Sequence, residues 1–291
     1  MNSFLFYDME DNMDYQWYPG HMTKAIRQMK EDIKLIDLVI ELLDARIPIS
    51  SRNPDIDNLG QNKSRLVLLN KADLADEEQN NKWISYFKDK GIIALKINSK
   101  NKQGIKEINN AVMIACKEKI ERDRKRGIIN RPVRAMVVGI PNVGKSTFIN
   151  AYAGRNCAKT GNKPGVTKGK QWIKLSKTLE LLDTPGILWP KFDDKKIGLH
   201  LAFIGSMNDN ILDISDMAYE LIKLLNNIYP DAIKKRYNIE GDEDPVQVMY
   251  QVAEVRGCKL KGNQPDLDKT SSIIMDDFRS GKLGRITLDR L

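Results

Sequence analysis

The fold of this chain of 291 residues follows from one stretch, Gly139-Ile140-Pro141-Asn142-Val143-Gly144-Lys145-Ser146. An apolar run over residues 133–138 precedes it and predicts a strand, and the residues from Lys145 onward predict a helix. Glycine lets the backbone approach phosphates closely, and the N–H groups at the start of the helix face their negative charge. A glycine-rich turn between a strand and a helix therefore predicts a phosphate-binding loop.

Each part of this loop has an expected contact with a nucleotide. The Lys145 ammonium would reach the β- and γ-phosphates, and the Ser146 hydroxyl would bind magnesium. We therefore expect nucleotide contacts from Asn142, Val143, Gly144, Lys145, Ser146 and Thr147.

A second motif predicts which base is bound. Asn70-Lys71-Ala72-Asp73 directly follows the apolar run 66–69, and an Asp73 carboxylate there would accept hydrogen bonds from guanine N1–H and the exocyclic amine. Adenine lacks both donors and would leave the carboxylate unpaired, which is costly. The segment at Asn98 and Ser99, after the next predicted strand, fits a second base-binding loop whose backbone N–H groups meet guanine O6.

A third motif, Asp183-Thr184-Pro185-Gly186, follows the apolar run 179–182. We expect Asp183 to hold magnesium through water and the Gly186 N–H to meet the γ-phosphate. Thr167 lies between the phosphate-binding loop and this motif. It is the candidate switch threonine, which would bind magnesium only when the γ-phosphate is present.

Strands that alternate with helices predict a parallel-rich α/β sheet with helices on both faces, followed by a helical domain. We expect an acidic tail over residues 1–15, a nucleotide-binding domain over 16–195 and a C-terminal all-helical domain over 196–291 that contacts RNA. The expected strands are 38–43, 66–69, 92–97, 133–138, 171–175 and 179–182, and the expected helices are 23–36, 77–90, 105–126, 213–228, 245–256 and 269–281, with another from Lys145.

The order of the motifs differs from that of an ordinary small GTPase, in which the phosphate-binding loop comes first. Here both base-reading segments precede it, and the Asp183–Gly186 motif comes last. A circular permutation gives this order and preserves the pocket, because chain termini often lie close together and surface loops tolerate new ends. The permutation ties the γ-phosphate sensor directly to the C-terminal helices. Nucleotide state is therefore expected to set their orientation.

Composition restricts the setting of the protein. The net charge is +8 and the pI about 9.2, which suits a polyanionic partner. The three cysteines match no zinc spacing, and the acidic N-terminal residues argue against a signal or transit peptide. No apolar run is long enough to span a membrane. We expect a cytoplasmic monomer that binds neither membrane nor DNA.

The permuted order and four motifs closely resemble the circularly permuted GTPases, and the resemblance covers nearly the whole chain. The motifs are Trp17-Tyr18-Pro19-Gly20-His21-Met22, Asp44-Ala45-Arg46, the phosphate-binding loop, and Asp183-Thr184-Pro185-Gly186-Ile187-Leu188-Trp189-Pro190. The resemblance implies a GTP-hydrolysing factor that acts in late assembly of the bacterial large ribosomal subunit, with ribosomal RNA and ribosomal proteins as partners.

The resemblance also implies how hydrolysis would proceed. Ile187 stands where Ras-like enzymes place the water-orienting glutamine, and His21 is the implied replacement. Asn142 is implied to bind a potassium ion whose charge offsets that of the transition state. Hydrolysis by the isolated protein would be slow and stimulated by the large subunit. The other histidine, His200, lies in an apolar stretch and is expected to pack in the core.

Two basic segments are candidate contacts for RNA phosphates, residues 155–174 and 117–134, although acids interrupt the second. Solvation alone also explains the second segment. From the residues alone, two other functions stay open. One is an RNA-binding regulator that uses GTP only as a structural ligand, and the other is a small-molecule kinase of the phosphate-loop class.

Overall fold

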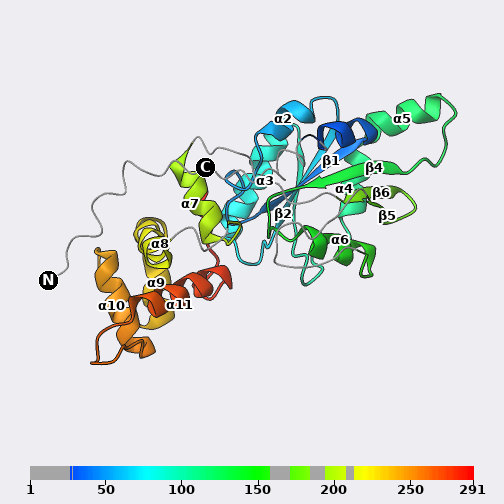
Figure 1. Cartoon of the computed structure of the whole chain (residues 1–291). Helices are drawn as coiled ribbons and strands as arrows, with labels where there is room; N and C mark the ends of the chain where they lie inside the picture. The colour runs from blue at the N-terminus through cyan, green and yellow to red at the C-terminus, as the bar shows by residue number, and fades with distance from the viewer. Residues whose placement is uncertain (1–26, 28, 158–170, 184–193, 208–212) are drawn as a thin grey trace.

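The computed structural model describes residues 27, 29–157, 171–183, 194–207 and 213–291, and it contains a six-stranded sheet followed by a helical region (Figure 1). The sheet order is β3-β2-β1-β4-β6-β5. All neighbouring pairs are parallel except β5 and β6, which are antiparallel at one edge. The strands are β1 (Leu38–Asp44), β2 (Ser64–Asn70), β3 (Ile93–Lys96), β4 (Val133–Val138), β5 (Gln171–Lys174) and β6 (Leu179–Asp183).

Helices cover both faces of the sheet, as the unbroken apolar runs predicted. Alternate residues of β1 show this division. Ile40 belongs to the same apolar cluster as residues of α4 (Ile108–Ala115) and α6 (Lys145–Ala153), whereas Val39 packs with the N-terminal helical residues. The helices of this part are η1 (Ile33–Leu35), α2 (Asp55–Leu59), α3 (Glu77–Asp89), α4 (Ile108–Ala115), α5 (Lys117–Lys125) and α6 (Lys145–Ala153).

The prediction of one long helix over residues 105–126 was wrong in one respect, because the chain forms two helices, α4 and α5, with a break at Cys116. Hydrogen bonds from Cys116 N to Val112 O and from Ile120 N to Cys116 O still span the break. No glycine or proline marks it. The bend accompanies a tertiary contact, in which Lys119 pairs with Asp37 at 3.1 Å next to the start of β1.

The C-terminal helical region starts with α7 (Lys195–Phe203), which the sequence did not predict as a separate helix. Helix α10 (Pro245–Arg256) is capped at both ends, because the Asp244 side chain accepts from Val246 N and Gly257 ends the helix in the left-handed conformation. The other helices are α8 (Ile214–Ile228), α9 (Asp231–Tyr237) and α11 (Leu267–Arg279). None of the helices within the described ranges is long and apolar enough to cross a membrane.

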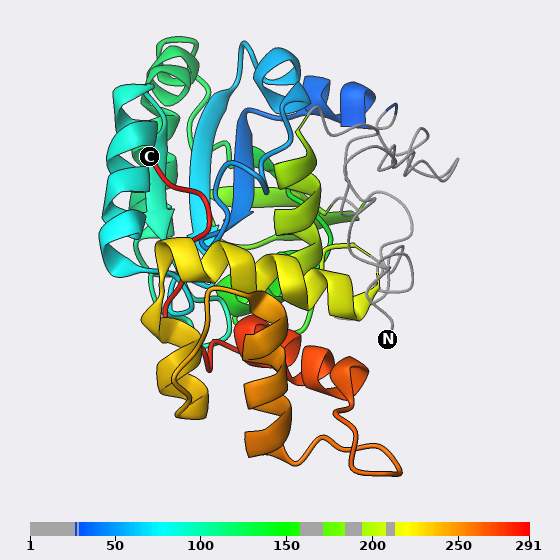
Figure 2. The same cartoon turned by 90° about the vertical axis from the view of Figure 1, so that its left-hand side faces the viewer.

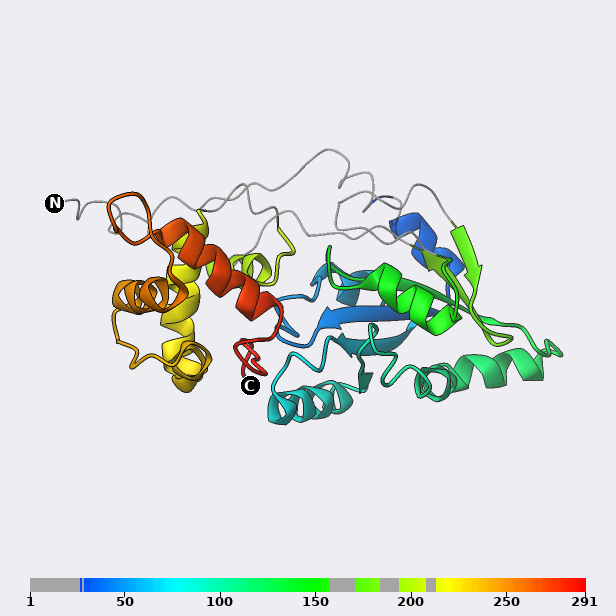
Figure 3. The same cartoon turned by 90° about the horizontal axis from the view of Figure 1, so that it is seen from below.

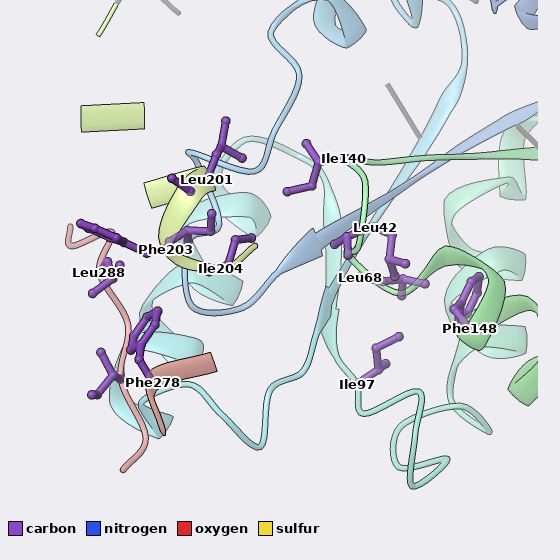
Figure 4. Packing of buried hydrophobic residues seen from close by; sticks show 14 of the residues in the cluster. Leu42, Leu68, Ile97, Ile140, Phe148, Leu201, Phe203, Ile204, Phe278 and Leu288 are labelled. Atoms are coloured by element: carbon purple, nitrogen blue, oxygen red, sulfur yellow. The ribbon is translucent and has the colours of Figure 1, made fainter. Parts of the chain in front are cut away.

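One apolar cluster runs from the sheet into the helical region. Figure 4 shows Leu42, Leu68 and Phe148 on one side and Phe203, Phe278 and Leu288 on the other. After α11 the chain returns to the sheet domain, and Figure 2 shows its last residues, in red, running beside α3. The helical region is therefore attached to the sheet domain by buried contacts as well as by the chain itself.

Candidate functional site

The carboxyl ends of β1, β2, β3, β4 and β6 lie at one edge of the sheet, because these five strands are parallel. The phosphate-binding loop follows β4, the two base-reading segments follow β2 and β3, and Asp183 ends β6. This edge is where ligands bind in open α/β sheets. The permuted chain therefore brings its separated motifs together, as predicted.

The phosphate-binding loop needs glycine at two positions for steric reasons. Gly144 has a φ of 100°, and a Cβ there would lie 2.6 Å from Asn70 Nδ2. A Cβ on Gly139 would lie 2.5 Å from the carbonyl oxygen of Leu42. The Lys145 ammonium donates to the carbonyl oxygens of Gly139 and Ile140, each at 3.0 Å, so it lies inside the curve of the loop.

Asn70 connects three of the predicted segments. Its Nδ2 donates to Val143 O at 2.8 Å, in the phosphate-binding loop. Its Oδ1 accepts from Ser99 N at 3.1 Å and from Ser99 Oγ at 2.8 Å, in the second base-reading segment. One buried amide thus fixes the distance between the base-reading and phosphate-binding parts of the site.

Lys71 makes a second connection, through a buried carboxylate at the end of β1. Its Nζ lies 3.0 Å from Asp44 Oδ2 and donates to Asn142 O at 3.0 Å. Arg46 binds the same carboxylate through Nε and Nη2 at 2.9 and 2.8 Å. Burial alone would raise the pKa of Asp44, but Arg46 and Lys71 hold that pKa far below its usual value. Asp44 therefore stays ionised and orders both loops.

The structure also places the remaining predicted site residues. Ala72 and Asn98 are buried. Asn98 Oδ1 accepts from the backbone N–H groups of Lys100 and Asn101. Asp73 and Thr147 are exposed, Ser146 is half-buried, and Val143 is buried beneath the loop. Three predicted residues, His21, Thr167 and Gly186, lie outside the described residues.

The phosphate-binding loop contacts the C-terminal helical region directly. Asn142 Nδ2 donates to Gly205 O at 2.7 Å, and Ser206 Oγ donates to Pro141 O at 2.9 Å. Gly205 and Ser206 follow α7, whose last turn is held to α11 because Arg279 donates to the carbonyl oxygens of Ala202 and Phe203. The loop is therefore hydrogen-bonded to a turn that lies between two packed helices.

A buried contact also joins the two parts, and the sequence did not predict it. Asp289 accepts from Ser50 N and Ser50 Oγ, both at 2.7 Å, and lies 2.9 Å from His200 Nδ1. Burial would raise the pKa of Asp289, but its hydrogen bond with His200 and those with Ser50 lower it. His200 is buried as expected, yet it also serves as a polar link.

This serine, histidine and aspartate do not form a nucleophilic triad. Ser50 Oγ lies 3.0 Å from His200 Nδ1, the same nitrogen that contacts Asp289, whereas a triad uses both ring nitrogens. His200 Nε2 is buried without a partner among the residues the structure describes. The group is a structural link, and only its long-range geometry reveals it, because the three residues are far apart in the sequence.

A phosphate-binding loop, a guanine-type Asn-Lys-x-Asp segment and Asp183, the first residue of the Asp-x-x-Gly sequence, lie at one edge of a parallel sheet and define a P-loop GTPase, in circularly permuted order. The family model described as "50S ribosome-binding GTPase" matches residues 134–250. The chain is 51% identical to ribosome biogenesis GTPase A of Bacillus cereus, covering 95% of this chain and 94% of that protein. It is 48% identical to ribosome biogenesis GTPase A of Priestia megaterium, covering 95% and 97%.

A solved structure agrees with these relatives. The GNP-bound crystal structure of YlqF from T. maritima matches with a TM-score of 0.65 and 26% identity, covering 92% of this chain and 98% of that one. The chain belongs to the ribosome biogenesis GTPase A family. It binds guanine nucleotide and is an enzyme that hydrolyses GTP.

Proposed function

We propose that this GTPase is an assembly factor for the large ribosomal subunit, which it binds in the cytoplasm in its GTP state and leaves after hydrolysis. The observation that carries the proposal is the similarity over nearly the full length to proteins named ribosome biogenesis GTPase A, together with the match of residues 134–250 to the "50S ribosome-binding GTPase" model.

The surface charge supports an RNA partner. Helix α5 extends away from the sheet (Figures 1 and 3) and bears the basic residues predicted from the sequence. Lys119 and Asp123 pair with each other at 3.0 Å and are buried, so they do not reach the surface. The exposed basic residues at this end are Lys117, Arg122, Arg124, Lys125, Arg126 and Arg131, against the exposed acids Glu118 and Glu121. Such a surface suits the phosphate backbone rather than the bases.

The nucleotide roles follow from the positions of the loops. We propose that Asp73 reads the guanine base, that Asn70, Lys71, Ala72, Asn98 and Ser99 shape its pocket, and that residues 142–147 and Gly186 bind the phosphates. Magnesium fits this edge of the sheet, because Ser146 lies in the first turn of α6 and Asp183 ends β6, next to the strand that leads into the loop. Bound magnesium would neutralise phosphate charge, with Ser146, Asp183 and Thr167 holding it.

For hydrolysis we propose that His21 orients the attacking water in place of glutamine, and that Thr167 senses the γ-phosphate. A potassium ion at Asn142 is compatible with the geometry. The side-chain nitrogen of Asn142 donates to Gly205 O, and the side-chain oxygen Oδ1 of Asn142 is the group that would coordinate the cation. A monovalent cation there would offset charge developing on the phosphates.

We further propose that residues 16–195 and 196–291 act as a nucleotide-binding and a responding domain, after an acidic tail over 1–15. The hydrogen bonds from Asn142 to Gly205 and from Ser206 to Pro141 support this coupling. A change in the loop between GTP and GDP would alter them and bias the orientation of the helices.

Sedimentation with purified ribosomal subunits tests the partner. The protein should pellet with large subunits in a non-hydrolysable GTP analogue, should pellet less in GDP, and should not pellet with small subunits. Arg124→Glu should weaken pelleting and reduce its salt dependence. Lys88→Glu, the same charge reversal at an exposed site on α3, should not. Equal pelleting with both subunits, or none in any nucleotide state, would refute the proposal.

A further inference from the structure

The last residues of the chain lie against the guanine-reading loop, although more than two hundred residues separate them in the sequence. Ile286 N donates to Leu74 O at 2.9 Å, and Thr287 Oγ1 accepts from Asp76 N at 3.1 Å. Ile286 and Thr287 are buried, with 2% and 0% of their surface exposed. This C-terminal segment therefore forms one wall of residues 72–76.

Arg285 makes the most specific of these contacts. Its Nε donates to Ala75 O at 2.8 Å, and its Nη2 donates to Ala72 O at 3.1 Å and to Glu77 Oε2 at 2.8 Å. A guanidinium can hold several acceptors at once because its N–H donors have a fixed planar arrangement. Arg285 thus bridges two backbone carbonyl groups on either side of Asp73 and Leu74.

These contacts fix the peptide groups that orient Asp73. The amide N–H of Ala72 donates to Ile97 O at 3.1 Å, which attaches that residue to the end of β3. The carbonyl of Ala72 accepts from Arg285 and from Asn80 Nδ2 at 3.2 Å. Because this carbonyl belongs to the peptide group preceding Asp73, its orientation sets the direction of the Asp73 side chain.

We propose that Arg285 is a positioning residue for the guanine-reading loop and thereby raises both affinity for guanine nucleotides and selectivity against other purines. This inference rests on the proposed assignment of Asp73 to the base. Arg285 acts through Ala72 and Ala75 and does not touch the nucleotide itself. The C-terminal segment is then part of the base-binding site of an enzyme whose base-reading motif lies near its N-terminus.

Arg285 is not needed to hold the C-terminal segment in place. Its side chain is 48% exposed, so its burial contributes little to folding. The neighbouring anchors Leu288 and Asp289 are buried and hold the segment in place by separate contacts, with Arg46 O and with Ser50. Removing the guanidinium should therefore loosen residues 72–76 without releasing the segment.

The test compares dissociation constants for GDP, IDP and ADP in the full-length protein and its variants. IDP lacks the exocyclic amine that Asp73 would bind, so the ratio of IDP to GDP dissociation constants reports how well Asp73 is positioned. Arg285→Ala should weaken GDP binding roughly tenfold and reduce this ratio. Arg285→Lys should give intermediate values, because one ammonium cannot bridge both carbonyl groups. If Arg285→Ala does not fold, the Arg285→Lys variant provides the test.

The matched control is Lys282→Ala in the same segment. Lys282 pairs with Asp277 of α11 at 3.1 Å, so its partner lies outside residues 72–76. Its removal should leave both constants within twofold of wild type. An unchanged ratio of IDP to GDP constants in both Arg285 variants would overturn the inference.

Asp73→Asn, measured in parallel, tests the assignment of Asp73 to the base separately from the role of Arg285. If it lowers the ratio while the Arg285 variants do not, only the role of Arg285 fails. If it leaves the ratio at the wild-type value, the assignment of Asp73 to the base fails, and the inference about Arg285 fails with it.

Discussion

Asn142, in the phosphate-binding loop, donates its side-chain amide to the carbonyl oxygen of Gly205 at 2.7 Å. The segment that binds phosphates is therefore hydrogen-bonded to the turn that ends α7. In an ordinary GTPase order the chain would return to the sheet after the Asp-x-x-Gly motif. Here the chain continues into the C-terminal helices, and the turn after α7 contacts the phosphate-binding loop.

This contact predicts that nucleotide state changes the orientation of the C-terminal helices. X-ray scattering profiles of the protein should differ between GDP and a non-hydrolysable GTP analogue, because a shift of the loop must alter its bonds to Gly205 and Ser206. Ser206→Ala removes the bond to Pro141 O. It should therefore reduce the difference between the scattering profile in GDP and that in the analogue. Coincident wild-type profiles would exclude a large reorientation.

The glycine at position 144 predicts a pair of variants with different outcomes. Gly144→Ala should abolish nucleotide binding, because its Cβ would meet Asn70 Nδ2 at 2.6 Å and displace the residue that joins the three loops. Gly154 also has a positive φ, 67°, but a Cβ there has open space around it. Gly154→Ala should cost only about 1 kcal/mol and keep GDP binding.

Isothermal titration with GDP, alongside urea unfolding, measures both effects. Wild-type affinity in the Gly144→Ala protein would contradict the proposed role of this loop. Lost affinity in Gly154→Ala would show that a Cβ at a positive-φ glycine beside this helix can abolish binding without any collision with Asn70.

The buried link at Asp289 predicts a stability effect that depends on pH. Asp289→Asn should lower the free energy of unfolding at pH 7 by about 2–4 kcal/mol, since an amide cannot accept all the hydrogen bonds that Ser50 and His200 supply. The folded-state pKa of Asp289 lies below its ordinary value of 3.8. Its ionised form therefore stabilises the fold above pH 3.8, and this contribution is lost as the pH falls through the lowered pKa.

The difference between wild type and Asp289→Asn should accordingly narrow below pH 3.8. Urea unfolding at several pH values checks this. Asp231→Asn removes an exposed carboxylate that pairs with Lys235, and it should leave the unfolding free energy nearly unchanged. A pH-independent difference for Asp289→Asn would show that packing, and not ionisation, explains the effect.

Local patterns predicted most of the sheet and the edge where the loops meet. The apolar run at 38–43 and the strand before Gly139 were confirmed, because a buried parallel strand is visible in its own residues. The same kind of reasoning failed at Cys116, where no local breaker residue marks the bend. The helix break at Cys116 lies close to a tertiary ion pair between Lys119 and Asp37, which local sequence does not reveal.

The contacts between the two parts of the chain were not predictable in this way. Arg285 and Asp289 have no motif of their own, and their partners Ala72 and Ser50 lie at the other end of the sequence. His200 was predicted only as a packing residue, because an apolar helix conceals the carboxylate that it meets in three dimensions. Such residues become recognisable only when the fold brings them together.

If this enzyme works on the large ribosomal subunit, its GTP hydrolysis rate in potassium buffer should depend on whether purified large subunits are present. We expect large subunits to raise the rate at least tenfold, equivalent to about 1.4 kcal/mol in the barrier. His21→Ala should abolish this rise while GTP still binds. Tight GTP binding with no rise in rate would show that the large subunit does not activate the enzyme, and an undiminished rise in His21→Ala would exclude that histidine from the reaction.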